Sequence, residues 1–270
     1  MDTNRRRVLI TGAGSGLGLA LAHRYARNGA RVACVDLLAD RAEAAAAALS
    51  GTGHLALVAD VGDDASMQAL HDRIQREWGG LDVLINNAGI ASVGPMVETT
   101  MEEWRKILDV DLVGVVRGCR LFLPAMLAAR SGQIINTASF AGLAGAPGMM
   151  TYGVAKAAVV ALSEQLRAET HHHGVRVSVI CPAFFRTNLL ETAFASDKVK
   201  AKVIKLMDTS PDTLDGVADK VFASAERGDF MIIPTKREPM RWRLKRWWPG
   251  LYFKQVAKLA DRRTRTSSGQ

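Results

Sequence analysis

The chain has 270 residues, 48% of them hydrophobic, enough to form a sizeable core in one large α/β domain or two small ones. It contains no run of about 18 uncharged apolar residues, so we expect no membrane-spanning helix, and its short basic start lacks the long apolar region of a signal peptide. Three dispersed cysteines, Cys34, Cys119 and Cys181, predict a reducing compartment without disulfides, and no Cys/His grouping has metal-ligand spacing.

Positive charge is concentrated near the C-terminus. The whole chain carries a net charge of +8, while the stretch from Lys236 to Gln270 contains 11 basic and 2 acidic residues. The other residues, 24 basic and 25 acidic, are close to neutral. We therefore divide the sequence into a near-neutral domain, residues 1–235, and a basic extension, residues 236–270.

Short apolar runs with the length of strands alternate with helical patterns along the domain. This alternation predicts a parallel sheet covered by helices on both faces. The predicted strands cover residues 7–11, 31–36, 54–58, 83–86, 133–137, 176–180 and 230–233. The predicted helices cover residues 16–28, 41–49, 64–78, 101–130, 151–172 and 214–227.

A glycine-rich turn, Thr11 to Gly18, joins the first predicted strand to the first predicted helix. Glycines reach φ > 0 and leave no Cβ in the way of a pyrophosphate, and the free N–H groups of the helix start then point at the phosphates. The alternative is a tight turn that uses glycine for geometry alone. Asp36, which ends the second strand about 20 residues later, favours dinucleotide binding because its carboxylate can accept from ribose hydroxyls.

Tyr152 and Lys156 lie at i and i+4, on one face of a predicted helix. An ammonium group beside a phenol lowers the phenol pKa from about 10, which suits proton transfer near neutral pH. Tyr and Lys at this spacing also occur by chance in many helices. Ser139 follows the end of the strand 133–137, where open α/β sheets bind ligands, and its hydroxyl can hydrogen-bond a reacting oxygen.

The glycine spacing T-G-x-x-x-G-x-G resembles that of the short-chain dehydrogenase/reductase family. The run Asn86-Asn87-Ala88-Gly89 and the spacing of Ser139, Tyr152 and Lys156 are similar to the same family, and the resemblance spans roughly residues 7 to 235. It implies a Rossmann-type, doubly wound parallel sheet of about seven strands with helices on both faces, in a single domain.

The resemblance also implies residue roles. Tyr152 is the expected general acid/base, Lys156 tunes it and bonds the nicotinamide ribose, and Ser139 polarises the substrate oxygen. Asp111 stands where the family has asparagine in a V-N-L-x-G pattern, in the proton relay. An ionised aspartate can accept a hydrogen bond from water there but cannot donate one. Ala183 stands where the family usually has glycine after proline.

The expected cofactor is NAD rather than NADP, because the Asp36 carboxylate would repel a 2′-phosphate and the glycine turn contains no Arg or Lys. Arg41 is the basic residue that could reach such a phosphate. Asp60 lies at the adenine ring in the family, although the local sequence suits a helix cap equally well. The expected cofactor residues are Gly12, Ser15, Gly16, Leu17, Gly18, Asp36, Leu37, Asp60, Val61, Asn87, Ala88, Gly89, Tyr152, Lys156, Pro182, Phe185 and Thr187.

Methionine, phenylalanine and leucine gather near the predicted catalytic strand ends and suggest a broad apolar substrate site, although such residues also build cores. The pattern favours a lipophilic secondary alcohol or ketone, such as a long-chain, steroid-like or terpenoid compound. The expected substrate residues are Ser139, Tyr152, Met149, Phe184, Leu189 and Leu190, with Met150, Phe185 and Phe194 in the same cluster.

These features predict an NAD-dependent alcohol dehydrogenase or ketoreductase, which transfers a hydride between NAD(H) and a secondary alcohol or ketone. The alternative is a non-catalytic NAD-binding regulator on the same fold. The helices predicted over 101–130 and 151–172 resemble the pair that family members pack into a four-helix bundle between subunits. We therefore expect a homodimer or homotetramer, and no metal or nucleic acid.

The family resemblance does not cover the basic extension. It mixes tryptophans with Arg and Lys, and after Pro249-Gly250 apolar residues recur at helical spacing. This pattern is typical of a helix in a membrane interface, so residues 236–263 predict contact with an anionic membrane surface. The alternatives are a lid over the substrate site, a subunit interface, or a disordered end from Arg262. We expect a cytoplasmic protein, either free or peripheral at the inner membrane face.

Overall fold

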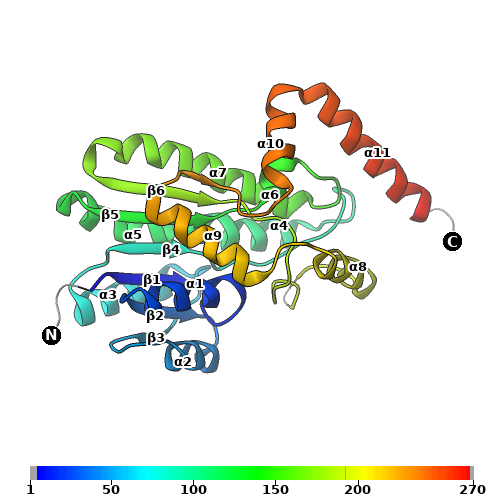
Figure 1. The fold of residues 1–270 in the computed structure, drawn as a ribbon. Helices are drawn as coiled ribbons and strands as arrows, with labels where there is room; N and C mark the ends of the chain where they lie inside the picture. The colour runs from blue at the N-terminus through cyan, green and yellow to red at the C-terminus, as the bar shows by residue number, and fades with distance from the viewer. Residues whose placement is uncertain (1–4, 192, 268–270) are drawn as a thin grey trace.

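A seven-stranded parallel sheet in the order β3-β2-β1-β4-β5-β6-β7 forms the centre of the protein (Figure 1). The computed structural model describes residues 5–191 and 193–267. Every predicted strand is confirmed, with ends that differ by at most one residue. The strands are β1 (Arg7–Thr11), β2 (Arg31–Asp36), β3 (Leu55–Val58), β4 (Val83–Asn86), β5 (Gly132–Thr137), β6 (Val175–Ile180) and β7 (Met231–Ile232).

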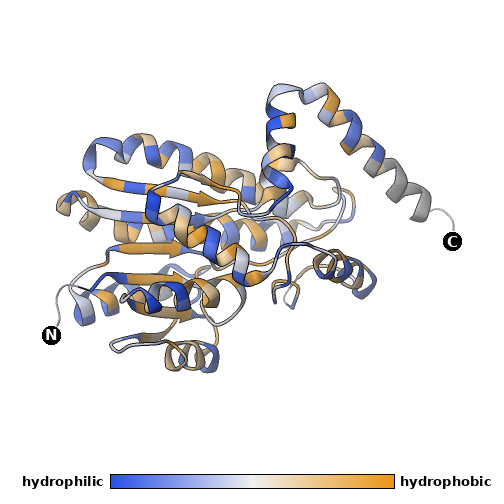
Figure 2. Cartoon of the chain, in the orientation of Figure 1, coloured by the Kyte–Doolittle hydropathy of each residue, from blue (hydrophilic) through white to orange (hydrophobic). Residues whose placement is uncertain are grey.

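Helices cover both faces of this sheet, because alternate strand residues point to opposite sides. Leu9 belongs to the core on one side, whereas Val8 and Ile10 belong to the core on the other. Figure 2 shows the strands as mainly hydrophobic, as expected for a sheet buried on both faces. One layer contains α1 (Gly16–Arg27), α2 (Ala39–Ala47) and α9 (Leu214–Arg227). The other contains α3 (Asp64–Trp78), α5 (Gly114–Ala129) and α7 (Met150–Thr170).

The helix predicted over 101–130 differs in its middle. It consists of α4 (Met101–Leu108), the π-helical turn η1 (Asp109–Val113) and α5. A π-helical turn adds a residue to the helical repeat and often occurs at a functional site. Here it carries Asp111, which is fully buried. Sequence periodicity does not reveal a single turn of this kind.

Within the described part of the chain, one helix, Met101–Ala129, is long and apolar enough to cross a membrane by length and composition. No such helix was expected from the sequence. Its inner side, including Val115, Phe122 and Met126, packs in the core against the sheet. This packing explains the apolar composition in a helix of the sheet-covering layer.

Three further helices were not predicted: α6 (Phe140–Ala144), α8 (Asp197–Asp208) and α10 (Glu238–Trp247). The sequence did contain a signal for α8, because Val199, Val203 and Met207 recur at four-residue spacing. The short α6 is only five residues long and gives no periodic signal.

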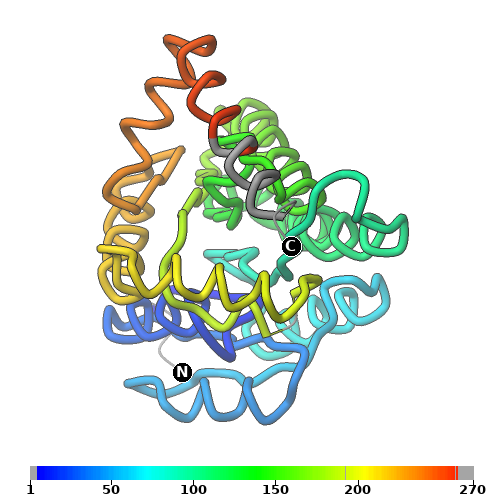
Figure 3. The backbone as a smooth tube through the Cα atoms, turned by 90° about the vertical axis from the view of Figure 1, so that its right-hand side faces the viewer, coloured from blue at the N-terminus to red at the C-terminus, as the bar shows by residue number. Residues whose placement is uncertain are grey.

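The basic extension forms α10 and α11 (Pro249–Ser267), which leave the body of the protein near α6 (Figures 1 and 3). Lys245 Nζ on α10 donates a hydrogen bond to the Leu143 carbonyl of α6, and Trp242 packs against the main core. Residues 268–270, the end of the predicted extension, lie outside the described residues.

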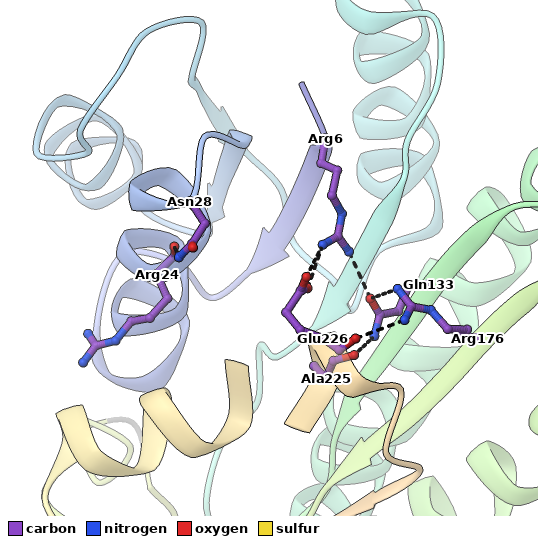
Figure 4. A network of polar contacts seen from close by, with 7 residues as sticks. All are labelled: Arg6, Arg24, Asn28, Gln133, Arg176, Ala225 and Glu226. Atoms are coloured by element: carbon purple, nitrogen blue, oxygen red, sulfur yellow. Dashed lines mark hydrogen bonds and ion pairs between the residues drawn. The ribbon is translucent and has the colours of Figure 1, made fainter. Parts of the chain in front are cut away.

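A buried amide fastens α9 to the N-terminal edge of the sheet (Figure 4). Gln133 of β5 is only 1% exposed. Its Oε1 accepts from Arg6 at 3.1 Å and from Arg176 at 3.3 Å, and its Nε2 donates to the Ala225 carbonyl at 2.8 Å. Arg6 also pairs with Glu226 at 2.6 Å. This single side chain therefore joins β1, β5, β6 and α9.

Replacing Gln133 with Leu should lower the free energy of unfolding by about 1–3 kcal/mol, because the buried Ala225 carbonyl loses its donor and two guanidinium groups each lose one of their acceptors. Chemical denaturation measures this change. Gln68→Leu is the matched control, since Gln68 is exposed on α3, and its effect should stay within about 0.5 kcal/mol. Equal effects of the two substitutions would contradict the role assigned to Gln133.

Candidate active site

The glycine-rich turn lies at the point where the sheet order reverses, between β1 and β4. Gly12 has φ +64° and Gly16 has φ +54°, conformations that favour glycine. A Cβ on Gly18 would lie 2.2 Å from the Gly12 carbonyl oxygen, so this glycine allows α1 to pack on the turn. Gly18 does not line the cavity described below, and its part in cofactor binding is to hold the turn in shape.

The first N–H groups of α1, which have no acceptor earlier in the helix, lie at this crevice. Ser15 is the N-cap residue and has an extended backbone, but its side chain accepts no capping hydrogen bond from the described residues. Beside it, the nearest neighbour that a Cβ on Gly16 would meet is Thr187, at 3.7 Å. A helix N-terminus with room and free donors suits a phosphate group, so these residues fit a dinucleotide pyrophosphate.

Asp36 lines the same crevice at the end of β2. Its Oδ2 accepts from the Gly14 N–H at 3.0 Å, and its Oδ1 accepts from the Leu38 N–H at 3.2 Å. Arg41 stands nearby but pairs with Glu191 at 2.9 Å. The carboxylate is thus held in one orientation with lone pairs left for a ligand hydroxyl.

Asp60 and Asn87 occupy neighbouring strand ends. The Asp60 Oδ1 accepts from the Gly62 N–H at 2.7 Å, whereas the cap of α3 is Asp63, which accepts from Ser66. The structure therefore contradicts the alternative that Asp60 caps the next helix. Asn87 Nδ2 donates to the Thr11 carbonyl at 3.0 Å and ties the end of β4 to the end of β1.

The predicted catalytic residues meet at the ends of β5 and α7. Ser139, Tyr152 and Lys156 are 8%, 6% and 3% exposed. The Ser139 hydroxyl accepts from the Ala141 N–H at 3.1 Å and donates to the Pro182 carbonyl at 3.3 Å. Lys156 Nζ donates to the Thr137 carbonyl at 3.1 Å, which holds the ammonium group under the strand end.

Asp111 joins this cluster through η1. Its Oδ2 lies 3.3 Å from Lys156 Nζ, and its Oδ1 accepts from the Ile90 N–H at 2.8 Å. Oδ2 accepts no hydrogen bond of good geometry within the described part of the chain. Burial raises the pKa of Asp111, although the Lys156 charge and the Ile90 N–H oppose this shift. The aspartate is thus a charged partner of the lysine, whereas an asparagine at this position could offer only a neutral carbonyl oxygen.

The electrostatics of Tyr152 differ from the sequence expectation. Burial raises the pKa of the Tyr152 phenol above its ordinary value; Lys156 lowers that pKa, Asp111 raises it, and the hydrogen bond with Ser139 lowers it. The net direction is upward, whereas the sequence predicted a lowered pKa. The prediction was wrong for the protein without a bound cofactor, because it counted the lysine but neither the burial of the phenol nor the Asp111 charge.

A single cavity of about 950 Å³ contains both the glycine turn and the Ser139 cluster. Every predicted cofactor, catalytic and substrate residue except Gly18 lines it. Met150 and Phe194 of the predicted apolar cluster do not line it and are 37% and 40% exposed.

Sequence reasoning missed α8 in the far wall of this cavity, and it included α10 and α11 only as one of several interpretations of the extension, a lid. This wall is formed by Lys202, Val203, Leu206 and Met207 of α8, by Glu238 and Arg241 of α10, and by Tyr252, Gln255 and Val256 of α11. The spacing within α8 was visible in the sequence, but the position of α10 and α11 over the cavity depends on tertiary packing. Residues 5–191 and 193–267 contain no group of three or more His, Cys, Asp or Glu side chains that could hold a metal ion.

A parallel sheet with a glycine turn at its reversal point and an open helix N-terminus defines a dinucleotide-binding α/β protein. Residues 6–198 match the family model described as short chain dehydrogenase. The chain therefore belongs to the short-chain dehydrogenase/reductase family, and it is an alcohol dehydrogenase of that family that acts on CH–OH donors.

Relatives agree with this assignment. The chain is 41% identical over 183 residues to D-threitol dehydrogenase of Mycolicibacterium smegmatis, covering 67% of this chain and 70% of that enzyme. A short-chain dehydrogenase/reductase from Burkholderia phymatum, solved with NAD, superposes with a TM-score of 0.84 at 28% identity, over 93% of this chain and 96% of that one. One from Sphingobium yanoikuyae, solved with NADPH, gives 0.74 at 29% identity over 95% of both chains.

Proposed function

We propose that the protein is an NAD-dependent dehydrogenase that interconverts a lipophilic secondary alcohol and its ketone. The observation that carries this proposal is the single cavity that joins the Ser139, Tyr152 and Lys156 cluster to the glycine turn. Beyond the cluster, Val203, Leu206 and Met207 of α8 and Val256 of α11 give this cavity an apolar part, which suits an apolar substrate. Lys202, Glu238, Arg241 and Gln255 add polar groups to the same wall.

The bound nicotinamide dinucleotide supplies the hydride acceptor or donor. Around it, the Ser139 hydroxyl turns its proton from the Pro182 carbonyl to the substrate oxygen. The Tyr152 phenol oxygen takes the hydroxyl proton of an alcohol or returns one to a ketone. The Lys156 ammonium lies 5.8 Å from the centre of the Tyr152 ring, where its charge favours the phenolate and can also meet a ribose hydroxyl. Burial of all three side chains keeps bulk water away from the reacting oxygen.

Asp111 moves the pH dependence of alcohol oxidation to higher pH. Oxidation needs the phenolate form of Tyr152, and the negative charge of Asp111 raises the pKa of that phenol. Ketone reduction uses the protonated phenol, which predominates at neutral pH when the pKa is raised. The aspartate therefore favours the reductive direction near neutral pH.

NAD is the proposed cofactor, since Asp36 is held at the end of β2 with lone pairs free and Arg41 is engaged by Glu191. A 2′-phosphate would meet the Asp36 carboxylate. The two solved relatives contain NAD in one case and NADPH in the other, so the preference rests on this chain's own residues.

The alternative function, a non-catalytic NAD-binding regulator, draws support only from Asp111, which weakens the positive field at Tyr152. The complete Ser139, Tyr152 and Lys156 cluster within one cavity favours an enzyme.

We further propose a cytoplasmic homodimer or homotetramer. Its interface would include α4 and α7, which expose Met101 (64%) and Val154 (44%).

The first test compares the rates of NADH oxidation with two ketones as substrates. One is a long-chain methyl ketone, and the other is the polar ketose that results when a secondary hydroxyl of D-threitol is oxidised. We expect a higher kcat/KM for the long-chain ketone, because burial of each additional methylene contributes about 0.8 kcal/mol. Tyr152→Phe should abolish nearly all turnover with either ketone while NAD binding, measured by fluorescence, is largely kept. Wild-type turnover in this variant would refute the mechanism, and a preference for the polar ketone would refute the lipophilic substrate.

Asp111→Asn should keep activity and move the rising, acid-side limb of the alcohol-oxidation profile to lower pH, because the charge that raises the Tyr152 pKa is removed. The measurement is kcat/KM against pH for both enzymes. An unchanged profile would show that Asp111 does not influence Tyr152, and complete loss of activity would show that the aspartate has a chemical role of its own.

Asp36→Ala should weaken NAD binding and narrow the difference in affinity between NAD and NADP. The Asp36 carboxylate both accepts hydrogen bonds from the ribose hydroxyls of NAD and repels the 2′-phosphate of NADP. Dissociation constants for the two dinucleotides test this expectation. Asp40→Ala, an exposed acid on α2 outside the lining of the cavity, is the control and should leave both constants unchanged. A wild-type protein that binds NADP more tightly would contradict the assignment.

A further inference from the structure

The turn between α10 and α11 exposes four large apolar side chains. Trp247 is 68% exposed, Trp248 61%, Leu251 52% and Phe253 69%. We call these residues the apolar tip. Figures 1 and 3 both show this turn at an extremity of the molecule, well away from the sheet. Clustered apolar residues at a protruding turn mark an interaction surface rather than ordinary surface variation.

Basic residues surround the apolar tip. Arg243, Arg246, Lys254 and Lys258 are all exposed on the two helices next to it. The sequence from 239 to 260 contains no Asp or Glu. Exposed tryptophans between Arg and Lys suit the interface of a bilayer, where the rings lie at the headgroup level and the charges meet anionic phosphates.

The opposite side of the extension is fixed to the body. Lys245 is tied to the Leu143 carbonyl of α6, and Tyr252 and Val256 of α11 line the cavity. One side of the same helix pair therefore bounds the proposed substrate site while the other carries the apolar tip. The apolar tip is thus joined to the cavity wall through α11, since Leu251 and Phe253 adjoin Tyr252 in the sequence.

We propose that the apolar tip and its basic neighbours dock the protein on an anionic lipid surface. A second copy of the chain is the less favoured occupant, because two extensions, each with 11 basic and 2 acidic residues, repel each other. An anionic bilayer complements this charge and also accepts the tryptophans. Docking would help catalysis by delivering an apolar substrate from the bilayer, and this benefit rests on the proposed function. The docking itself rests only on the residues of the extension.

The test is sedimentation of the full-length protein with vesicles, without substrate, so that its result does not depend on the proposed activity. Vesicles of phosphatidylcholine with phosphatidylglycerol should bind the protein at low salt. Binding should be weaker to phosphatidylcholine alone and should fall as salt rises. No binding to the anionic vesicles at low salt would overturn the proposal.

Two sets of variants separate the apolar and electrostatic contributions. Trp247→Ser combined with Trp248→Ser and Phe253→Ser should reduce vesicle binding at least tenfold. Each of Arg243→Gln, Arg246→Gln and Lys254→Gln should reduce it about fivefold. Met96→Ser combined with Val97→Ser is the matched control, because those side chains are 58% and 92% exposed on the body, and its binding should equal that of the wild type.

A soluble substrate and the mass in solution complete the test. The tip residues do not line the cavity, so their variants should keep wild-type turnover of a water-soluble ketone, which shows that they fold. Light scattering should give the same mass for the wild type and the tip variants. Vesicle binding that the tip variants retain, or a smaller mass in those variants, would overturn the proposal, and the smaller mass would identify the tip as a contact between subunits.

Discussion

The site depends on the reversal of strand order between β1 and β4. In a parallel sheet the carboxyl ends of all strands lie at one edge, and connections that leave in opposite directions open a crevice there. The glycine turn after β1, Asp36 after β2, Asn87 after β4 and Ser139 after β5 come from distant parts of the sequence yet line one cavity. Apart from the glycine turn, which needs positive φ at Gly12 and Gly16, their placement requires only the ends of ordinary strands.

The buried pair of Lys156 and Asp111 gives this site its individual character. Two opposite charges that are almost completely buried are costly to desolvate, and they persist only when each has a partner. The lysine has a backbone carbonyl and the aspartate has a backbone N–H, so both are held even without a ligand. Asp111 offsets the positive charge of Lys156 near Tyr152. In this way one residue of the π-helical turn influences the pH dependence of alcohol oxidation.

The sequence predicted the sheet and the layered helices well because the strands are buried on both faces and form continuous apolar runs. The residues that it assigned to the cofactor and to catalysis, apart from Gly18, all line one cavity, since most of them follow strand ends that meet at the same side of the sheet. It did not predict the direction of the Tyr152 pKa shift, because burial depends on how α7 packs. Nor did it predict that Gly18 serves packing, since only the distance to the Gly12 carbonyl shows this.

The far wall of the cavity is a second feature that the sequence predicted only in part. The pattern of α8 was present in the sequence, whereas contacts of Tyr252 and Val256 with the cavity depend on α10 folding back from α6. The extension had four competing interpretations at the sequence level. In the structure, α11 lines the cavity and the apolar tip is exposed. The same helix pair can therefore cover the cavity with some residues and offer others as a docking surface.

In the proposed mechanism, Ser139 and Tyr152 hold the reacting oxygen of an apolar substrate. A crystal structure with NAD and an unreactive long-chain amide, a mimic of the ketone, tests it most directly. We predict that the amide oxygen lies within hydrogen-bond distance of both hydroxyls and that the chain runs between α8 and α11. An amide oxygen bound away from both hydroxyls would contradict the account.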